Sequence, residues 1–267
     1  MRIARFTKDG LDPTYGIIEL AVDHGEHPET IAAISADPLA GVPVNYTGER
    51  FDLDEVRLLS PVIPRSKVIG IGRNYADHAK ELGNEVPEQL LAFLKPNTCV
   101  IGPGESIVRP AGCEDLSHEG ELAIVVGRFC KEVPAERVPD VIFGYTIAND
   151  ITARDWQTTD GQWWRAKGAD TFLPLGPWIN THVGIDEASQ LQIRTTVGDE
   201  LRQDGNTRDM LRGITEIVVE LTKAMTLLPG DLILTGTPSG VGPLVGGDEV
   251  SVSVEGLGTL TNPVVDE

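Results

Sequence analysis

Three acidic residues near two apolar runs are the first candidates for chemistry in this sequence. Glu119 and Glu121 lie two residues apart in SHEGELAIVV (117–126), and Asp150 follows the apolar run 141–149. Because strand residues alternate between faces, Glu119 and Glu121 should point the same way at the head of a buried strand. The pattern is open to two interpretations: acids that reach water at a strand end, or a divalent metal site. Three carboxylates with no nearby Cys or His ligand pair favour Mg²⁺ or Mn²⁺ over zinc.

A second candidate lies in GIGRNYADHAKELG (70–83). The segment 75–83 predicts about two turns of helix, and His78 and Glu81 would share one face of it. A carboxylate that orients an imidazole suits a general base, whereas the alternative is an exposed polar face. The preceding glycines suggest a dinucleotide fingerprint, but Tyr75 occupies the position of the required third glycine. We therefore exclude a Rossmann site.

Cations gather in one stretch of a strongly acidic chain. The formal net charge is −19, yet the predicted loop 153–178 contains Arg154, Arg165 and Lys167 together with the tryptophans 156, 163 and 164. This stretch could bind an anion, or it could be a structural loop pinned by aromatic residues. The loop 234–243 could likewise present backbone N–H groups and the hydroxyls of Thr235 and Thr237 to a carboxylate, or form only a tight turn.

The elements that would position these residues are mostly strands. Apolar runs predict strands at the ranges 67–72, 90–94, 121–127, 141–149, 175–181, 231–236 and 248–256. Residues 1–60 form a candidate separate unit, with two strands around a turn in 1–22, a brief helical turn in 30–39 and extended chain in 45–59. The Pro-flanked segment 60–67 is a candidate junction. Apolar spacing predicts one long helix over 207–228.

Composition limits the classes of function. The chain of 267 residues has 40% hydrophobic residues, and its acidity disfavours nucleic acid as a partner. No run is long enough for a membrane span, and the start lacks the apolar stretch of a signal peptide, so we expect a cytoplasmic protein. The cysteines Cys99, Cys113 and Cys130 are odd in number and scattered, which disfavours a disulfide framework.

The order of the motifs resembles the fumarylacetoacetate hydrolase family. The series is GRNYADHAKEL, FLKP, SHEGELAIVVG, NDITARDWQ, KGADTFLPLGPWI and LTGTPSGVGP, over about residues 61–267. Residues 1–60 are similar to the small N-terminal domain of many bacterial members. The likeness is greatest to members described as oxaloacetate decarboxylases or 2-hydroxyhepta-2,4-diene-1,7-dioate isomerases. The resemblance implies an α+β, mainly β fold, a mixed sandwich or roll, assembled as a homodimer.

The same resemblance implies roles for individual residues. It implies Mg²⁺ or Mn²⁺ at Glu119, Glu121 and Asp150, with Lys167 as the active-site lysine. His78 and Glu81 match the catalytic dyad of a lid segment. The implied positions near the substrate are Arg73, Tyr75, Gln157, Asp170 and Thr237.

We expect from this a metal-dependent enzyme that forms an enolate from 2-oxo or 2-hydroxydienoate dicarboxylic acids. Decarboxylation of oxaloacetate or isomerisation of a dienoate would follow. Two alternatives stay open: an acylpyruvate hydrolase that cleaves a C–C bond, and a metal- or carboxylate-binding β module without turnover.

Overall fold

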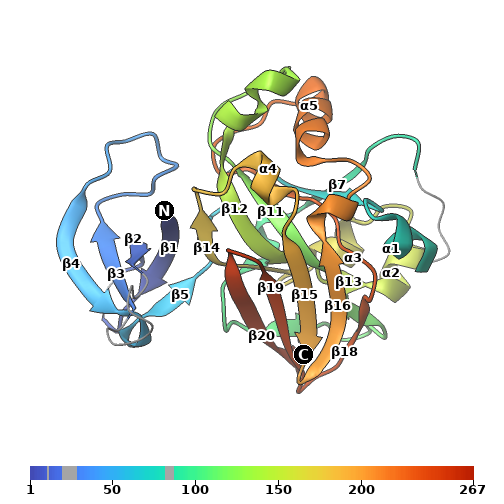
Figure 1. Cartoon of the computed structure of the whole chain (residues 1–267). Coiled ribbons are helices and arrows are strands. Elements are labelled where there is room, and N and C mark those ends of the chain that lie inside the picture. The colour runs from blue at the N-terminus through green and yellow to red at the C-terminus, as the bar shows by residue number, and fades with distance from the viewer. Residues whose placement is uncertain (11, 20–28, 82–86) are drawn as a thin grey trace.

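The computed structural model describes residues 1–10, 12–19, 29–81 and 87–267, with the backbone alone for 78–80. Strands dominate it, as expected for a mainly β fold (Figure 1). The strands are β1 (Arg2–Thr7), β2 (Thr14–Glu19), β3 (Thr30–Ile34), β4 (Tyr46–Asp52), β5 (Arg57–Leu59), β6 (Val68–Gly72), β7 (Leu91–Lys95), β8 (Val100–Ile101), β9 (Ile107–Arg109), β10 (Leu116–His118), β11 (Gly120–Val126), β12 (Ile142–Asn149), β13 (Thr152–Ala153), β14 (Leu173–Asn180), β15 (Gln192–Val197), β16 (Glu200–Asn206), β17 (Leu232–Leu234), β18 (Gly242–Leu244), β19 (Glu249–Val254) and β20 (Gly258–Asp266). The α-helices are α1 (Ala76–Glu81), α2 (Arg154–Thr159), α3 (Trp164–Gly168), α4 (Ile185–Ala188) and α5 (Ile214–Ala224).

One large sheet forms the centre of the molecule. Its strand order is β4-β3-β2-β1-β14-β12-β11-β17-β6-β7, with β5 beside β1 and β8 beside β14. The middle pair, β11 and β12, is antiparallel with Gly120 opposite Asn149. All seven residues of β11 are buried, because this strand is covered on both faces.

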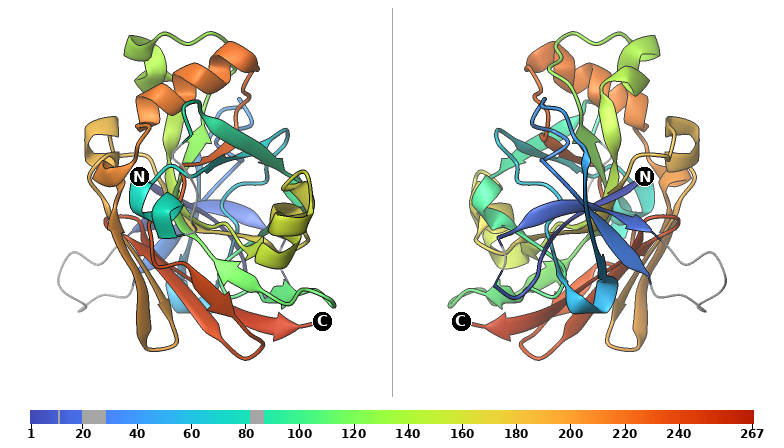
Figure 2. Two further views of the ribbon diagram at one scale, coloured as in Figure 1. Left: turned by 90° about the vertical axis from the view of Figure 1, so that its right-hand side faces the viewer. Right: turned by 90° about the vertical axis from the view of Figure 1, so that its left-hand side faces the viewer.

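A second sheet packs against the first and completes a sandwich. Its order is β16-β15-β19-β20-β9, and a small sheet β13-β10-β18 lies beside it. Ile193 of β15 and Val252 of β19 share a buried cluster with Leu122 and Ile124 of β11. Helix α5 contributes Ile217 to the same cluster, so it covers the end of the sandwich (Figure 2).

The described part of residues 1–60 forms the strands β1 to β5 and a separate buried cluster. Phe6, Ile18 and Ile31 form its buried centre. Strand β1 continues the large sheet by pairing with β14 at Arg2 opposite Asn180 and Ile3 opposite Ile179. The division of the chain into units 1–60 and 61–267 stays a prediction.

Three expectations about single elements were wrong. Residues 30–34 form strand β3 between β2 and β4, not a helical turn. The helix predicted over 207–228 is restricted to α5, because Gly213 is its N-cap and Met225 its C-cap. The predicted loop 153–178 contains α2, α3 and most of β14. The strands expected in 1–22 are present as the antiparallel pair β1 and β2.

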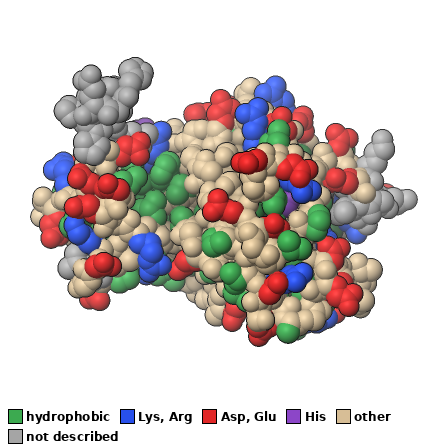
Figure 3. Space-filling model, turned by 90° about the horizontal axis from the view of Figure 1, so that it is seen from below, with side chains coloured by type: hydrophobic (Ala, Val, Ile, Leu, Met, Phe, Trp, Pro, Cys, Tyr) green, Lys and Arg blue, Asp and Glu red, His purple; other side chains and the backbone are tan. Residues whose placement is uncertain are grey.

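Acidic side chains are spread over the face seen from below (Figure 3), in agreement with the net charge of −19. None of the helices in the described part of the chain is long and apolar enough to cross a membrane.

Candidate metal and active site

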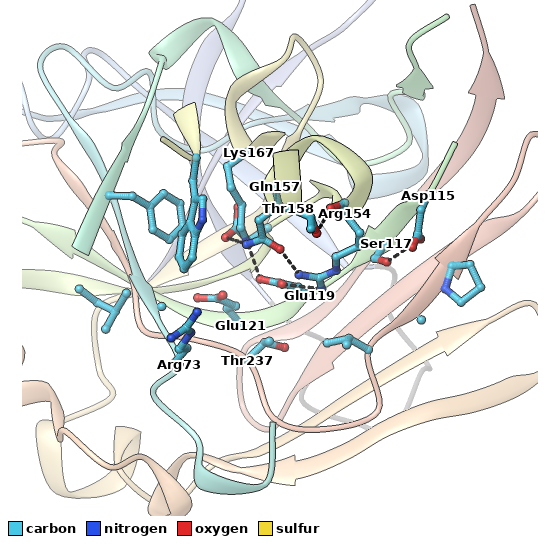
Figure 4. A pocket seen from close by; sticks show the side chains of 18 residues that line it. Arg73, Asp115, Ser117, Glu119, Glu121, Arg154, Gln157, Thr158, Lys167 and Thr237 are labelled. Atoms are coloured by element: carbon cyan, nitrogen blue, oxygen red, sulfur yellow. Dashed lines mark hydrogen bonds and ion pairs between the residues drawn. The ribbon is translucent and has the colours of Figure 1, made fainter. Parts of the chain in front are cut away.

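The antiparallel pairing of β11 and β12 brings the three acidic residues together. Glu121 lies at the start of β11, Asp150 directly follows β12, and Glu119 joins β10 to β11. One carboxylate oxygen from each residue lies within 4.8 Å of the other two, and all three residues are buried. Figure 4 shows Glu119 and Glu121 near Lys167 at one pocket. The Asp150 N–H donates to the Glu119 carbonyl at 2.8 Å, which fixes the two strand ends against each other.

Three cations neutralise this cluster. Lys167 of α3 donates from Nζ to Glu119 Oε2 at 2.6 Å and to Asp150 Oδ2 at 2.7 Å. Arg154, at the start of α2, pairs with Glu119 Oε1 at 2.6 Å. Lys95, the last residue of β7, pairs with Asp150 and donates to the Phe172 carbonyl at 3.0 Å. Burial without such partners would be too costly for these charges.

Burial and mutual repulsion alter the protonation of the cluster. Burial raises the pKa of Glu121 well above its ordinary value, and the nearby carboxylates of Asp150 and Glu119 raise it further. Burial opposes the charge of Lys167, but Asp150 and Glu119 outweigh it and raise the pKa of the ammonium. The Gly236 N–H donates to Glu121 Oε2 at 2.6 Å and supports its charged form.

The donor set fits a divalent metal ion. Three buried carboxylates supply hard oxygen atoms in one place, and neither a Cys nor a His from the described residues belongs to the group. Oxygen ligands of this kind suit Mg²⁺, Mn²⁺ or Ca²⁺ better than zinc.

A cavity of about 590 Å³ opens onto the carboxylates. Phe93 and Trp163 form an aromatic wall on one side, with ring centroids 5.5 Å apart. The Arg73 guanidinium lies 5.9 Å from the Trp163 ring centroid, and its backbone has a left-handed φ of 54°. Such a conformation is uncommon for a residue other than glycine, so the surrounding structure holds Arg73 in place. Of the residues predicted from the sequence, those lining the cavity are Arg73, Glu119, Glu121, Asp150, Gln157, Lys167 and Thr237.

Three predicted residues whose side chains the structure describes do not line this cavity. Tyr75 is buried and forms an isolated bridge with Met210. Asp170 is exposed beyond α3. The Glu81 carboxylate accepts the Gly240 N–H, with both oxygens 3.1 Å from the nitrogen. The side chain of His78 lies outside the described residues. Of the predicted dyad, the structure therefore describes only the side chain of Glu81.

The cationic residues of the segment 153–178 do not all belong to the site. Arg154 and Lys167 line the cavity, whereas Arg165 pairs with Asp160 at 2.6 Å. The Gln157 Oε1 accepts a hydrogen bond from Arg154 at 3.0 Å. Lys95 was not predicted as a site residue. Its signal in the sequence was a single charge at the end of the apolar run LLAFL.

Two family models and a curated relative match this chain. The family model described as "Fumarylacetoacetate (FAA) hydrolase C-terminal" matches residues 67–265, and "Rv2993c-like, N-terminal" matches residues 1–61. The oxaloacetate tautomerase YisK of Bacillus subtilis is 41% identical over 225 residues, which are 80% of this chain and 75% of that protein.

Two solved structures have the same fold. A structure described as 5-carboxymethyl-2-hydroxymuconate delta-isomerase from Mycobacterium smegmatis is 48% identical, with a TM-score of 0.89 and full coverage of both chains. Maleylpyruvate hydrolase from Sphingobium sp. SYK-6, in complex with manganese(II) and pyruvate, is 32% identical with a TM-score of 0.79, over 100% of this chain and 99% of that one. The matched model and these relatives show that the chain belongs to the fumarylacetoacetate hydrolase family.

Proposed function

We propose that this protein is a divalent-metal-dependent enzyme that forms an enolate from 2-oxo or 2-hydroxydienoate dicarboxylic acids. The observation that carries the proposal is the convergence of Glu119, Glu121 and Asp150 beside Lys167 at one cavity. The similarity to an oxaloacetate tautomerase and to an isomerase supports enolate chemistry. Keto–enol conversion, decarboxylation of oxaloacetate and isomerisation of a dienoate would share this intermediate.

In this proposal Glu119, Glu121 and Asp150 hold Mg²⁺ or Mn²⁺. The bound cation would act as a Lewis acid on the 2-oxo group and the adjacent carboxylate of the substrate. Lys167 remains an ammonium, since Asp150 and Glu119 raise its pKa despite its burial. Two of its three N–H donors are directed at those carboxylates, and the third would donate to the substrate oxygen on which negative charge develops.

The remaining roles concern binding and proton transfer. Arg73 and Gln157 line the cavity, where they would hold carboxylate groups of the substrate. Tyr75, Asp170 and Thr237 are retained as predicted substrate-side positions. His78, oriented by Glu81, would move the proton between carbon and solvent.

A second candidate function is hydrolysis of a C–C bond in an acylpyruvate. The similarity to a maleylpyruvate hydrolase bound to manganese(II) and pyruvate favours it. In that reaction the His78–Glu81 pair would activate water, and the leaving group would be an enolate of pyruvate.

Activity after removal and return of metal tests the proposal. We expect chelator-stripped protein to lose enol-to-keto conversion of oxaloacetate, followed by ultraviolet absorbance, and Mn²⁺ or Mg²⁺ to restore it. Glu119→Gln should lower the rate at least about 100-fold, because a ligand of the metal is lost. Unchanged activity in Glu119→Gln, or in stripped protein, would contradict the metal assignment.

Parallel assays separate the two candidates. Acetylpyruvate hydrolysis and pyruvate release from oxaloacetate should be measured on the same preparation. His78→Ala should impair hydrolysis more than decarboxylation, because only hydrolysis requires an activated water. Equal losses would contradict this division of roles.

A further inference from the structure

Gly120 links two of the proposed metal ligands, and both of its backbone polar groups are bound by side chains. Strand β17 pairs with β11 only from Ala123 to Val125, so it does not reach this residue. In its place, the Gly120 N–H donates to Gln203 Oε1 at 3.0 Å, and the Thr237 hydroxyl donates to the Gly120 carbonyl at 2.9 Å. Buried backbone groups need such partners where a strand is absent.

These bonds form a closed ring. Gln203 Nε2 donates to Thr237 Oγ1 at 2.7 Å and to the Pro238 carbonyl at 2.9 Å, so one carboxamide connects Gly120 with the loop that follows β17. Gln203 is fully buried and belongs to β16 of the second sheet. Only glycine fits at position 120, because a Cβ atom there would overlap Thr195 Oγ1.

The ring includes the backbone of Gly120, the residue between Glu119 and Glu121, and therefore affects the distance between their carboxylates. Thr237 lines the cavity next to them, and Gly236 of the same loop donates to Glu121 Oε2 at 2.6 Å. On the opposite edge, the Glu119 N–H donates to Asn149 Oδ1 at 2.9 Å. Hydrogen bonds therefore hold both edges of the segment 119–121. Gln203 connects this segment to the second sheet.

We propose that Gln203 is a positioning residue for the metal site: by closing the ring with Thr237, it holds Gly120 and thereby sets the separation of the Glu119 and Glu121 carboxylates. This inference rests on the proposed metal site, and it concerns a residue that touches neither substrate nor metal. Outer residues that orient metal ligands typically contribute about 10–100-fold to metal affinity.

The test is titration of the metal-stripped full chain with Mn²⁺ alone. Binding is measured by calorimetry, and the electron paramagnetic resonance spectrum of the bound ion is recorded. The variants are Gln203→Leu and Thr237→Val, which break the ring at different bonds. The control is Gln192→Leu, since Gln192 of β15 bonds Asp204 at the exposed surface. We expect at least about 10-fold weaker Mn²⁺ binding in both ring variants, an altered resonance spectrum, and no change in the control.

The double variant, with both Gln203→Leu and Thr237→Val, should have the same Mn²⁺ affinity as the single variant that binds Mn²⁺ less tightly. Either change alone opens the same ring, so the second change has no further effect. Hydrogen exchange of the Gly120 amide gives a readout without metal, and Gln203→Leu should accelerate it. If Gln203→Leu does not fold, Thr237→Val with the same control decides the question.

The outcomes distinguish the inference from its premise. Wild-type protein that binds no Mn²⁺ overturns the metal site and this role together. Wild-type protein that binds Mn²⁺, with ring variants binding within about 2-fold of it, overturns the role of Gln203 alone. Unchanged exchange of the Gly120 amide, or an equal loss of affinity in Gln192→Leu, also overturns it.

Discussion

At the scale of single residues, Lys95 is a buried cation whose removal we expect to be costly. Its side chain and that of Asp150 are 0% and 1% exposed. Loss of one partner of a buried pair typically costs about 3–5 kcal/mol, whereas an exposed pair contributes about 0–1 kcal/mol. We therefore expect Lys95→Met to lower the free energy of unfolding by about 3 kcal/mol, measured by urea denaturation in chelator.

The control for this prediction is Lys8→Met, which removes the 2.7 Å pair between Lys8 and Glu55 at the surface. It should cost less than about 1 kcal/mol. Equal losses in the two variants would mean that Asp150 is stabilised sufficiently by Lys167, and the prediction for Lys95 would be wrong.

The sequence predicted the acidic residues of the site better than their partners. Alternation along a strand is a local property, so the sequence pattern alone could group Glu119 with Glu121. Asp150 was only a candidate at the end of a second strand, and the family resemblance supplied its place beside the other two. Lys95 is 55 residues from Asp150, and Gln203 is 83 residues from Gly120. Such contacts depend on which strands become neighbours, and no local pattern reports that.

At the scale of elements, the glycines of β6 have a packing role. Gly70 lies opposite Phe93 of β7, and a Cβ atom at position 70 would overlap the Phe93 ring. That ring also lies under Lys167, whose Nζ is 5.3 Å from its centroid. We expect Gly70→Ala to lower the free energy of unfolding by about 1–3 kcal/mol, the usual cost of overpacking, in urea denaturation.

A control substitution and a compensating substitution test whether contact with the Phe93 ring is the cause. Gly161→Ala should be nearly neutral, because no atom lies within 4 Å of a Cβ built there. Phe93→Leu should restore part of the stability of Gly70→Ala by making room. A Gly70→Ala protein as stable as the wild type would show that the ring moves aside without cost.

Element boundaries were the weaker part of the sequence-based prediction. Apolar spacing continued from α5 back to Met210 and Leu211, but these residues pack beside the site segment instead. The Leu211 N–H donates to the Asn74 carbonyl at 2.7 Å, and Met210 bridges Tyr75. Met210 is only half-buried and Leu211 is exposed, so the apolar spacing at these two positions does not correspond to a buried helix face.

At the scale of the whole molecule, charge is divided between the surface and the site. The net charge is −19, and acidic groups are scattered over the face in Figure 3, yet Lys95, Arg154 and Lys167 are directed into one acidic cluster. The family resemblance predicted the mainly β sandwich, but the strand order joins distant segments and could not follow from local patterns. Homodimer assembly and a cytoplasmic location stay predictions.

The three thiols make global stability sensitive to alkaline pH. Burial raises the pKa of Cys99 and of Cys113 to about 11, and it raises that of Cys130 as well. In the unfolded chain these thiols lose their protons near pH 9.0, their ordinary pKa. Between that pH and about 11 the native state therefore binds more protons than the unfolded state, and the free energy of unfolding must fall as pH rises.

Cys99 allows this fall to be measured, because it is completely buried. A shift of its pKa from 9.0 to about 11 corresponds to a loss of roughly 2–3 kcal/mol near pH 11. Urea denaturation at pH 7.5, 9 and 10 should give a shallower decline for Cys99→Ala than for the wild type, even though the variant is less stable at pH 7.5. Other groups titrate in the same range in both proteins, so only the difference between the two slopes reports the thiol. Parallel slopes would show that Cys99 ionises as readily in the native state as in the unfolded chain.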